Sequence, residues 1–164
     1  MVKRNQAQAP ENRLVAFCTE KGKTVATAES CTGGLIAGRI TSVPGASAVF
    51  LGGVVSYANE VKRDVLGVPQ GVLDHAGAVS AECAEAMASG VRALLKADAA
   101  VSVTGIAGPD GGTPQKPVGL VWFGVATASG ARAESQRFDG DREAVRRQAC
   151  DLALQLLLEA ASAL

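Results

Sequence analysis

The residues best suited to chemistry lie in the stretch AESCTGG, at positions 28–34. It follows a β-rich run over residues 24–28 and opens into an apolar segment, a pattern that predicts a strand turning into a helix. Backbone N–H groups at a helix N-terminus are unpaired and partly positive, so they favour phosphate or a developing oxyanion. The stretch therefore suits either a nucleophile at Ser30 or an anion cradle. The residues that would contact a ligand in the cradle are Thr32, Gly33 and Gly34.

A second polar set, Tyr57, Asn59 and Lys62, follows the next predicted strand. If Asn59 caps a short helix, Lys62 falls in its first turn, where the helix dipole is unfavourable for an ammonium group. Burial would lower the pKa of Lys62 further. A neutral lysine can take the proton from a serine hydroxyl, and a tyrosine can relay a proton to a leaving group.

Each of these residues also has a plainer interpretation. Ser30 could be a helix-capping or turn serine, and Lys62 a solvated surface lysine. Cys31 is a competing nucleophile, but a catalytic cysteine usually needs a histidine partner. The chain has one histidine, His75, in a predicted loop, so a small buried thiol is the favoured interpretation of Cys31.

The glycine-rich loop TGIAGPDGG, at positions 104–112, is a further candidate for ligand binding. It leaves the end of a predicted buried strand, where open α/β sheets bind their ligands. It matches neither the Walker loop nor the dinucleotide-binding fingerprint. Its first residues, Thr104 and Gly105, would line the pocket, unless the loop is only a flexible connector.

Two arginines, Arg142 and Arg146, are four residues apart and share one face of the predicted final helix. Their planar guanidinium groups match the geometry of phosphate oxygens, so the pair is a candidate phosphate clamp. The same residues could instead lie on a solvated face, paired with Glu143 or Asp139.

Hydrophobic periodicity and turn residues predict the elements that would position these side chains. We expect helices over residues 11–21, 35–43 and 59–66, after Ser80 and after Asp141, and strands over 24–28, 48–57, 99–104, 118–127 and 131–138. The alternating first half and the terminal hairpin predict a three-layer α/β/α domain around a mixed, mostly parallel sheet. Residues 1–10 are expected to form a flexible tail, and residues 11–164 a single domain.

The amino-acid composition argues against several classes of partner. Sixteen basic and sixteen acidic residues cancel, which argues against a broad surface for nucleic acid. Four scattered cysteines and one histidine predict neither a disulfide framework nor a zinc site, so we expect no metal cofactor. No apolar run approaches the ~20 residues that span a bilayer, and a cytoplasmic domain without a membrane partner is expected. Trp122, Phe123 and the final helix could supply the interface of a homo-oligomer.

Taken together, the motifs resemble the nicotinamide-nucleotide amidohydrolases, a domain also found as the C-terminal part of the competence/damage-inducible CinA proteins. The motifs are AESCTGG at 28–34, YANEVK at 57–62, GAVS at 77–80, TGIAGPDGG at 104–112, KPVG at 116–119 and GDR at 140–142. Six ordered motifs at matching spacing are far more specific than any one of them. They extend from about Leu14 to the final helix, and the resemblance implies a three-layer α/β/α fold.

The resemblance also implies an activity, the deamidation of nicotinamide mononucleotide to nicotinate mononucleotide and ammonia, without a cofactor. Carried over by motif, Ser30 is the nucleophile, Lys62 its general base and Tyr57 the proton relay. Independently of the resemblance, we expect backbone N–H groups within residues 30–34 to hold the oxyanion.

A rival interpretation is a non-catalytic module that binds a nucleotide as a sensor or partner surface. It requires the same glycines and arginines, but it has no need for Ser30, Tyr57 and Lys62 together. An interaction domain without a ligand would leave the loop over residues 105–117 without a purpose. The three residues in combination favour the enzyme.

Overall fold

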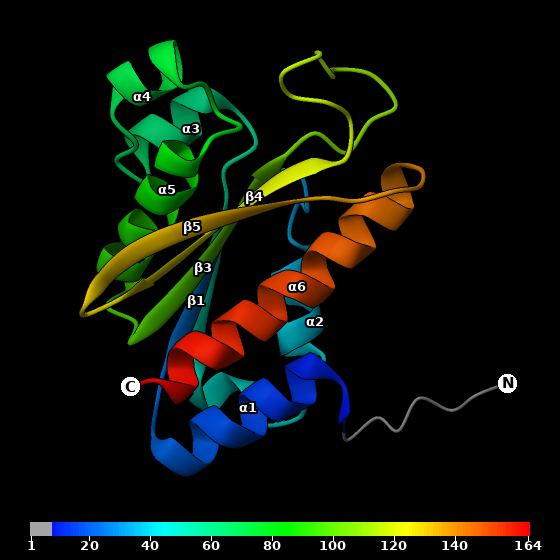
Figure 1. Ribbon diagram of the computed structural model, residues 1–164. Coiled ribbons are helices and arrows are strands. Elements are labelled where there is room, and N and C mark those ends of the chain that lie inside the picture. Colours follow the sequence, from blue (N-terminus) through cyan, green and yellow to red (C-terminus); the bar gives the residue numbers. More distant parts are fainter. Residues whose placement is uncertain (1–7) are drawn as a thin grey trace, which may run out of the picture.

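The computed structural model describes residues 8–164, and its centre is a mixed β-sheet with the strand order β2-β1-β3-β4-β5 (Figure 1). The strands are β1 (Val25–Glu29), β2 (Phe50–Val55), β3 (Ala99–Gly105), β4 (Leu120–Thr127) and β5 (Gly130–Arg137). β1 is parallel to both of its neighbours, whereas β4 is antiparallel to β3 and to β5. Four of these five strands therefore run in one direction, which confirms the predicted mixed, mostly parallel sheet.

Helices cover both faces of the sheet, so the predicted three-layer α/β/α arrangement is confirmed (Figure 1). One layer holds α1 (Pro10–Lys21), α2 (Leu35–Thr41) and α6 (Arg142–Ser162), and the other holds α3 (Asn59–Asp64), α4 (Gln70–His75) and α5 (Ala81–Leu95). A short 3-10 helix, η2 (Ala46–Ala48), precedes β2. None of the helices within residues 8–164 is long and apolar enough to cross a bilayer.

The central strands bring the candidate site together. Every residue of β1 is buried, as are the first six of β3, because helices pack on both faces of these strands. In the parallel register Glu29 is the partner of both Val55 and Val103. The chain segments that leave β1, β2 and β3 therefore emerge side by side at one edge of the sheet. Ser30 and Tyr57 lie on the segments that leave β1 and β2, and Thr104 lies near the end of β3 itself.

Two of the predicted helix starts are confirmed by their capping bonds. The side chain of Ser80 accepts a hydrogen bond from the backbone N–H of Cys83, and that of Asp141 accepts one from Ala144. Such caps typically contribute about 1 kcal/mol. The predicted cap at Asn59 is wrong, because Asn59 is the first residue of α3 and makes no capping bond.

Other boundaries differ modestly from the prediction. α1 begins at Pro10 rather than at residue 11, since proline is well suited to the first helical position. Residues 1–7 of the expected tail lie outside the described residues. The short helix α4 was not predicted; none of its residues is fully buried, and only Val72 and Leu73 pack partly buried against the core. Phe123, offered above for an interface between copies, is fully buried and packs edge-on against Phe138.

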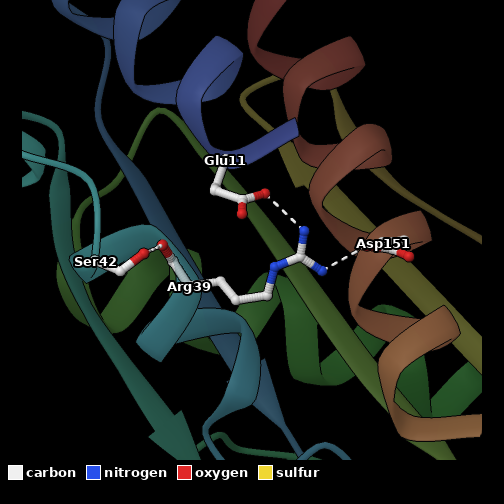
Figure 2. A network of polar contacts seen from close by, with 4 residues as sticks. All are labelled: Glu11, Arg39, Ser42 and Asp151. Carbon is white, nitrogen blue, oxygen red and sulfur yellow. Dashed lines mark hydrogen bonds and ion pairs between the residues drawn. The ribbon is translucent and has the colours of Figure 1, made fainter. Parts of the chain in front are cut away.

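A polar network ties the three helices of one layer together (Figure 2). The guanidinium group of Arg39, on α2, donates to Glu11 on α1 and to Asp151 on α6, both at 2.6 Å. The backbone carbonyl of Arg39 also accepts a hydrogen bond from Ser42 at 2.6 Å. The network fixes α2, and thereby the loop that joins β1 to α2.

Candidate active site

Ser30 and Lys62 form a close pair at the carboxyl edge of the sheet. Ser30 directly follows β1, and its Oγ lies 3.1 Å from the Nζ of Lys62. Lys62 reaches this position from α3, and its side chain is 1% exposed. The plainer interpretation of Lys62 as a solvated lysine is therefore wrong, and the two residues are within hydrogen-bonding distance although 32 positions separate them.

The surroundings of Lys62 favour its neutral form. Burial lowers the pKa of Lys62 from its ordinary value of 10.5, although the nearby thiols of Cys83 and Cys31 oppose this shift. Lys62 lies in the last turn of α3 rather than in the predicted first turn, and a helix dipole favours a cation there, so the dipole is not the cause that the sequence suggested. Desolvation of the ammonium is the dominant physical cause.

Backbone carbonyls around Lys62 direct its lone pair. Nζ lies 2.7 Å from the carbonyl oxygen of Ser56 and 3.3 Å from that of Tyr57. A neutral amine has two N–H bonds, and these two carbonyls can accept both of them. The remaining lone pair then faces the hydroxyl of Ser30, from which it can accept a proton.

Glu29 occupies the N-terminus of α2, which the sequence left open as an anion cradle. Its buried carboxylate accepts hydrogen bonds from the backbone N–H groups of Gly34, Ile36 and Ala37, at 3.0, 3.1 and 2.8 Å. A negative side chain within the protein thus takes the place that the sequence suggested for a phosphate. Glu29 lies within the AESCTGG motif, but its residue type and position alone did not predict this role.

The loop between Ser30 and α2 is closed by its own hydrogen bonds. The N–H of Gly33 donates to the carbonyl of Ser30 at 3.0 Å, and that of Leu35 donates to the carbonyl of Thr32 at 3.1 Å. Among residues 8–164 neither the N–H of Cys31 nor that of Thr32 donates to another residue. The expected oxyanion donors within residues 30–34 are therefore reduced to these two backbone N–H groups, of which that of Cys31 directly follows the nucleophile.

Arg146 lies behind this loop. Its Nε donates to the carbonyl of Cys31 at 3.0 Å, and its Nη2 donates to that of Thr32 at 3.1 Å. Both contacts are to the protein itself. The structure thus gives Arg146 a set of partners that differs from the phosphate predicted for it.

Ser30 and Lys62 open into a cavity of about 220 Å³. Of the residues proposed from the sequence, Ser30, Tyr57, Lys62, Thr104, Gly105 and Arg142 line it, whereas Thr32, Gly33, Gly34 and Arg146 do not. The lining also includes Cys31, Asn59, Ala78, Val79 and Ala107, of which Asn59 had been interpreted as a helix cap. Thr104 further donates to the carbonyl of Ala78 at 2.8 Å and so joins two walls of the cavity.

Tyr57 and Arg142 stand together at the mouth of the cavity. Tyr57 is 62% exposed, and its hydroxyl accepts a hydrogen bond from the Nη2 of Arg142 at 3.0 Å. The Nη1 of Arg142 donates to the carbonyl of Gly108, at 2.9 Å, and so fixes the guanidinium against the glycine-rich loop. The phenol accepts from a cation while its own proton remains available for donation.

A larger groove, of about 1050 Å³, lies between α1 and α6. Three of its charged residues are already paired, because Arg39 binds both Glu11 and Asp151, as Figure 2 shows. The described residues contain no cluster of three or more histidine, cysteine or carboxylate side chains that could hold a metal ion. Among residues 8–164 the Ser30 cavity, although smaller, is the one that joins a hydroxyl to a buried amine.

Comparison with known proteins supports the same assignment of family. The CinA C-terminal domain family matches residues 7–161. A CinA-like protein of Geobacter metallireducens is 57% identical over 127 residues, which cover 77% of this chain and 31% of that protein. A CinA-like protein of Citrifermentans bemidjiense is 52% identical over 147 residues, covering 90% of this chain and 36% of that protein. The chain thus spans about a third of the length of the curated relatives it matches.

Solved structures match along nearly the whole chain. The competence/damage inducible protein CihA from Agrobacterium tumefaciens superposes with a TM-score of 0.91 at 41% identity, covering 98% of each chain. A CinA superfamily protein from Escherichia coli gives a TM-score of 0.86 at 31% identity, covering 96% of this chain and 94% of that one. With its sequence motifs, its fold and these matches in agreement, the chain belongs to the CinA C-terminal domain family.

Proposed function

We propose that this domain hydrolyses the carboxamide of nicotinamide mononucleotide, giving nicotinate mononucleotide and ammonia. The observation that carries the proposal is the pairing of Ser30 with a buried Lys62 whose pKa is lowered, inside a cavity. Tyr57 and Arg142 at the mouth of this cavity add a proton donor and a cation. Membership of the CinA C-terminal domain family supports the same reaction through the resemblance described above.

The first step of the reaction forms a tetrahedral intermediate on Ser30. Neutral Lys62 takes the hydroxyl proton of Ser30 as Oγ attacks the carboxamide carbon. The carbonyl oxygen becomes an oxyanion, which the N–H of Cys31 can stabilise. A single donor of this kind typically contributes about 3 kcal/mol to transition-state stabilisation.

The next step releases ammonia and leaves the acyl-enzyme, and hydrolysis then restores the enzyme. The C–N bond breaks as the amide nitrogen receives a proton from the hydroxyl of Tyr57, and the proton on Lys62 replaces the one that Tyr57 has lost. Water then attacks the ester carbon, and its proton passes to Lys62. Breakage of the C–O bond returns that proton to Ser30 and frees the product acid, which loses its remaining proton to solvent and becomes the carboxylate.

Arg142 is the proposed ligand of the 5′-phosphate, since its guanidinium lines the cavity near the exposed edge. Replacing Arg142 with alanine is expected to raise the KM for the nucleotide by about 10- to 100-fold, because a hydrogen bond to a charged group is worth ~1.5–3 kcal/mol. Steady-state kinetics with Arg147→Ala as the matched control, an exposed arginine of the same helix, would measure this. An unchanged KM in Arg142→Ala would show that Arg142 does not bind the phosphate and that its role is limited to its contacts with Gly108 and Tyr57.

We expect the side chain of Cys31 to pack in the protein interior and not to act as the nucleophile. Burial raises the pKa of its thiol to about 11, so the reactive thiolate is scarce at neutral pH. Cys31→Ala should therefore retain nearly the full kcat in the ammonia-release assay, since the backbone N–H persists in the variant. Loss of all activity in Cys31→Ala would indicate that the nucleophile is Cys31 and not Ser30.

The proposed function is tested directly by incubating the purified protein with nicotinamide mononucleotide and measuring ammonia. Release of ammonia by the wild type but not by Lys62→Ala would establish the hydrolase and the role of its base. If neither protein releases ammonia while nucleotide binding is still measurable by calorimetry, the proposed hydrolase activity is excluded and the non-catalytic sensor module is favoured.

A further inference from the structure

We propose that Glu29 and Arg146 are positioning residues for Ser30. Together they hold the nucleophile loop, residues 30–33, because the negative Glu29 binds backbone N–H groups and the positive Arg146 binds backbone carbonyl groups. The inference rests on the proposed function in one respect, the identity of Ser30 as the nucleophile. It does not depend on which amide the enzyme hydrolyses.

Glu29 closes the loop from its far end. The residue precedes Ser30 directly, yet its carboxylate binds N–H groups that lie after the loop, on Gly34, Ile36 and Ala37. The side chain is buried, at 1% exposure, and both of its oxygens are used. A buried carboxylate is costly unless it is hydrogen bonded, so these bonds strongly favour the observed path of the chain.

Arg146 holds the loop from behind. Its guanidinium binds the carbonyls of Cys31 and Thr32 across more than a hundred positions of sequence. The approach is close, since a Cβ at Gly33 would meet the Nη2 of Arg146 at 3.4 Å, and Gly33 has a positive φ of 59°. Both features favour glycine at position 33.

These contacts fix the backbone of Ser30. In a trans peptide the C=O and N–H groups point in opposite directions, so binding the Thr32 carbonyl to Arg146 directs the N–H of Gly33 away from it. That N–H donates to the carbonyl of Ser30 at 3.0 Å, while the N–H of Ser30 donates to Val103 at 2.9 Å. The position of the Ser30 hydroxyl then depends only on rotation of its side chain, and the Nζ of Lys62 lies 3.1 Å from its Oγ.

Neither Glu29 nor Arg146 lines the cavity, so their effect on chemistry passes through Ser30. Losing either one is therefore expected to lower kcat and to leave the KM for nicotinamide mononucleotide unchanged. A displacement of about 1 Å at a reacting group can cost about 10²-fold in rate.

The test is the rate at which a fluorophosphonate probe modifies Ser30, followed by intact mass. In this reaction the Oγ–P bond forms, fluoride leaves and Lys62 takes the hydroxyl proton, so no nucleotide is needed. Glu29→Gln and Arg146→Met are each expected to slow the modification by about 10²-fold while the protein remains folded. Arg146→Lys keeps the charge but lacks the two-pronged geometry, so it should also be slow, and it tests the proposal if Glu29→Gln does not fold.

Two control variants separate positioning from general stability. Asp98 also binds a backbone group. Its carboxylate accepts a hydrogen bond from the N–H of Thr24 at 2.8 Å, at the other end of the sheet. Asp98→Asn should lower the thermal midpoint yet label at the wild-type rate. Arg147→Met, which removes an exposed arginine next to Arg146, should change neither quantity.

The outcomes distinguish this proposal from the proposed function. Slow labelling of folded Glu29→Gln and Arg146→Met supports positioning even if the wild type does not hydrolyse nicotinamide mononucleotide. Wild-type labelling rates in the folded variants would overturn it, as would a wild type that the probe does not modify. An Arg146→Met variant with normal labelling but a raised KM would instead make Arg146 a phosphate ligand.

Discussion

Replacing Lys62 with methionine is expected to lower the kcat for nicotinamide mononucleotide by about 10²- to 10⁴-fold, the usual effect of losing a general base. Methionine is similar to lysine in length and can occupy the same buried space, so the fold should persist. The substitution removes the amine that lies 3.1 Å from the Oγ of Ser30, and no described residue would replace it as a base there. Ammonia release measured on a variant with a cooperative thermal transition would check this expectation.

Lys21→Met is the matched control, because Lys21 is exposed at the end of α1 and pairs there with Glu20. It should keep the wild-type kcat. Substantial activity in Lys62→Met would exclude Lys62 as the base, whatever the behaviour of Ser30.

The pH dependence provides a second measure of the same residue. Because burial lowers the pKa of Lys62 from 10.5, the kcat of the wild type should rise with pH, with a midpoint below that value. Stability should follow the same sign. Between the lowered folded-state pKa and 10.5 the unfolded chain binds more protons, so the free energy of unfolding rises with pH in this window. Lys62→Met lacks the group and should not show this rise.

Replacing Ser30 with alanine is the second large effect that we expect, a loss of at least about 10³-fold in kcat. The hydroxyl is the proposed attacking group, and without it no acyl-enzyme can form. Binding should survive, because removal of one small polar group leaves the rest of the cavity, including Arg142, in place. Calorimetric titration with nicotinamide mononucleotide, beside rapid-quench mass spectrometry of the acyl-enzyme, would measure both properties.

The control for Ser30→Ala is Ser42→Ala. Ser42 is an exposed serine whose hydroxyl donates to the carbonyl of Arg39, away from the cavity. Its variant should turn over normally and form the acyl-enzyme. If Ser30→Ala retained a substantial kcat, or still accumulated an acyl-enzyme, the nucleophile would have to be another residue.

Much of the fold could be predicted because its signals are local. β1 and β3 are short runs of small, apolar and β-branched residues with few polar side chains, and such runs are typical of strands that are buried on both faces. Ser80 and Asp141 each cap the helix that follows, through bonds to an N–H three residues along the chain. Asn59 has the same local signal, but it became the first residue of α3 and lines the cavity instead.

The sequence by itself determined which reactive groups are present and that they lie at strand ends. Parallel strands place those ends at one edge, which brought Ser30, Tyr57 and Thr104 to a single cavity. Only the tertiary structure decided their electrostatics, since the burial of a charge and its partners depend on distant segments. Packing buried Lys62 and so lowered its pKa, filled the helix N-terminus with Glu29, and turned Arg146 towards backbone carbonyls 114 and 115 positions away.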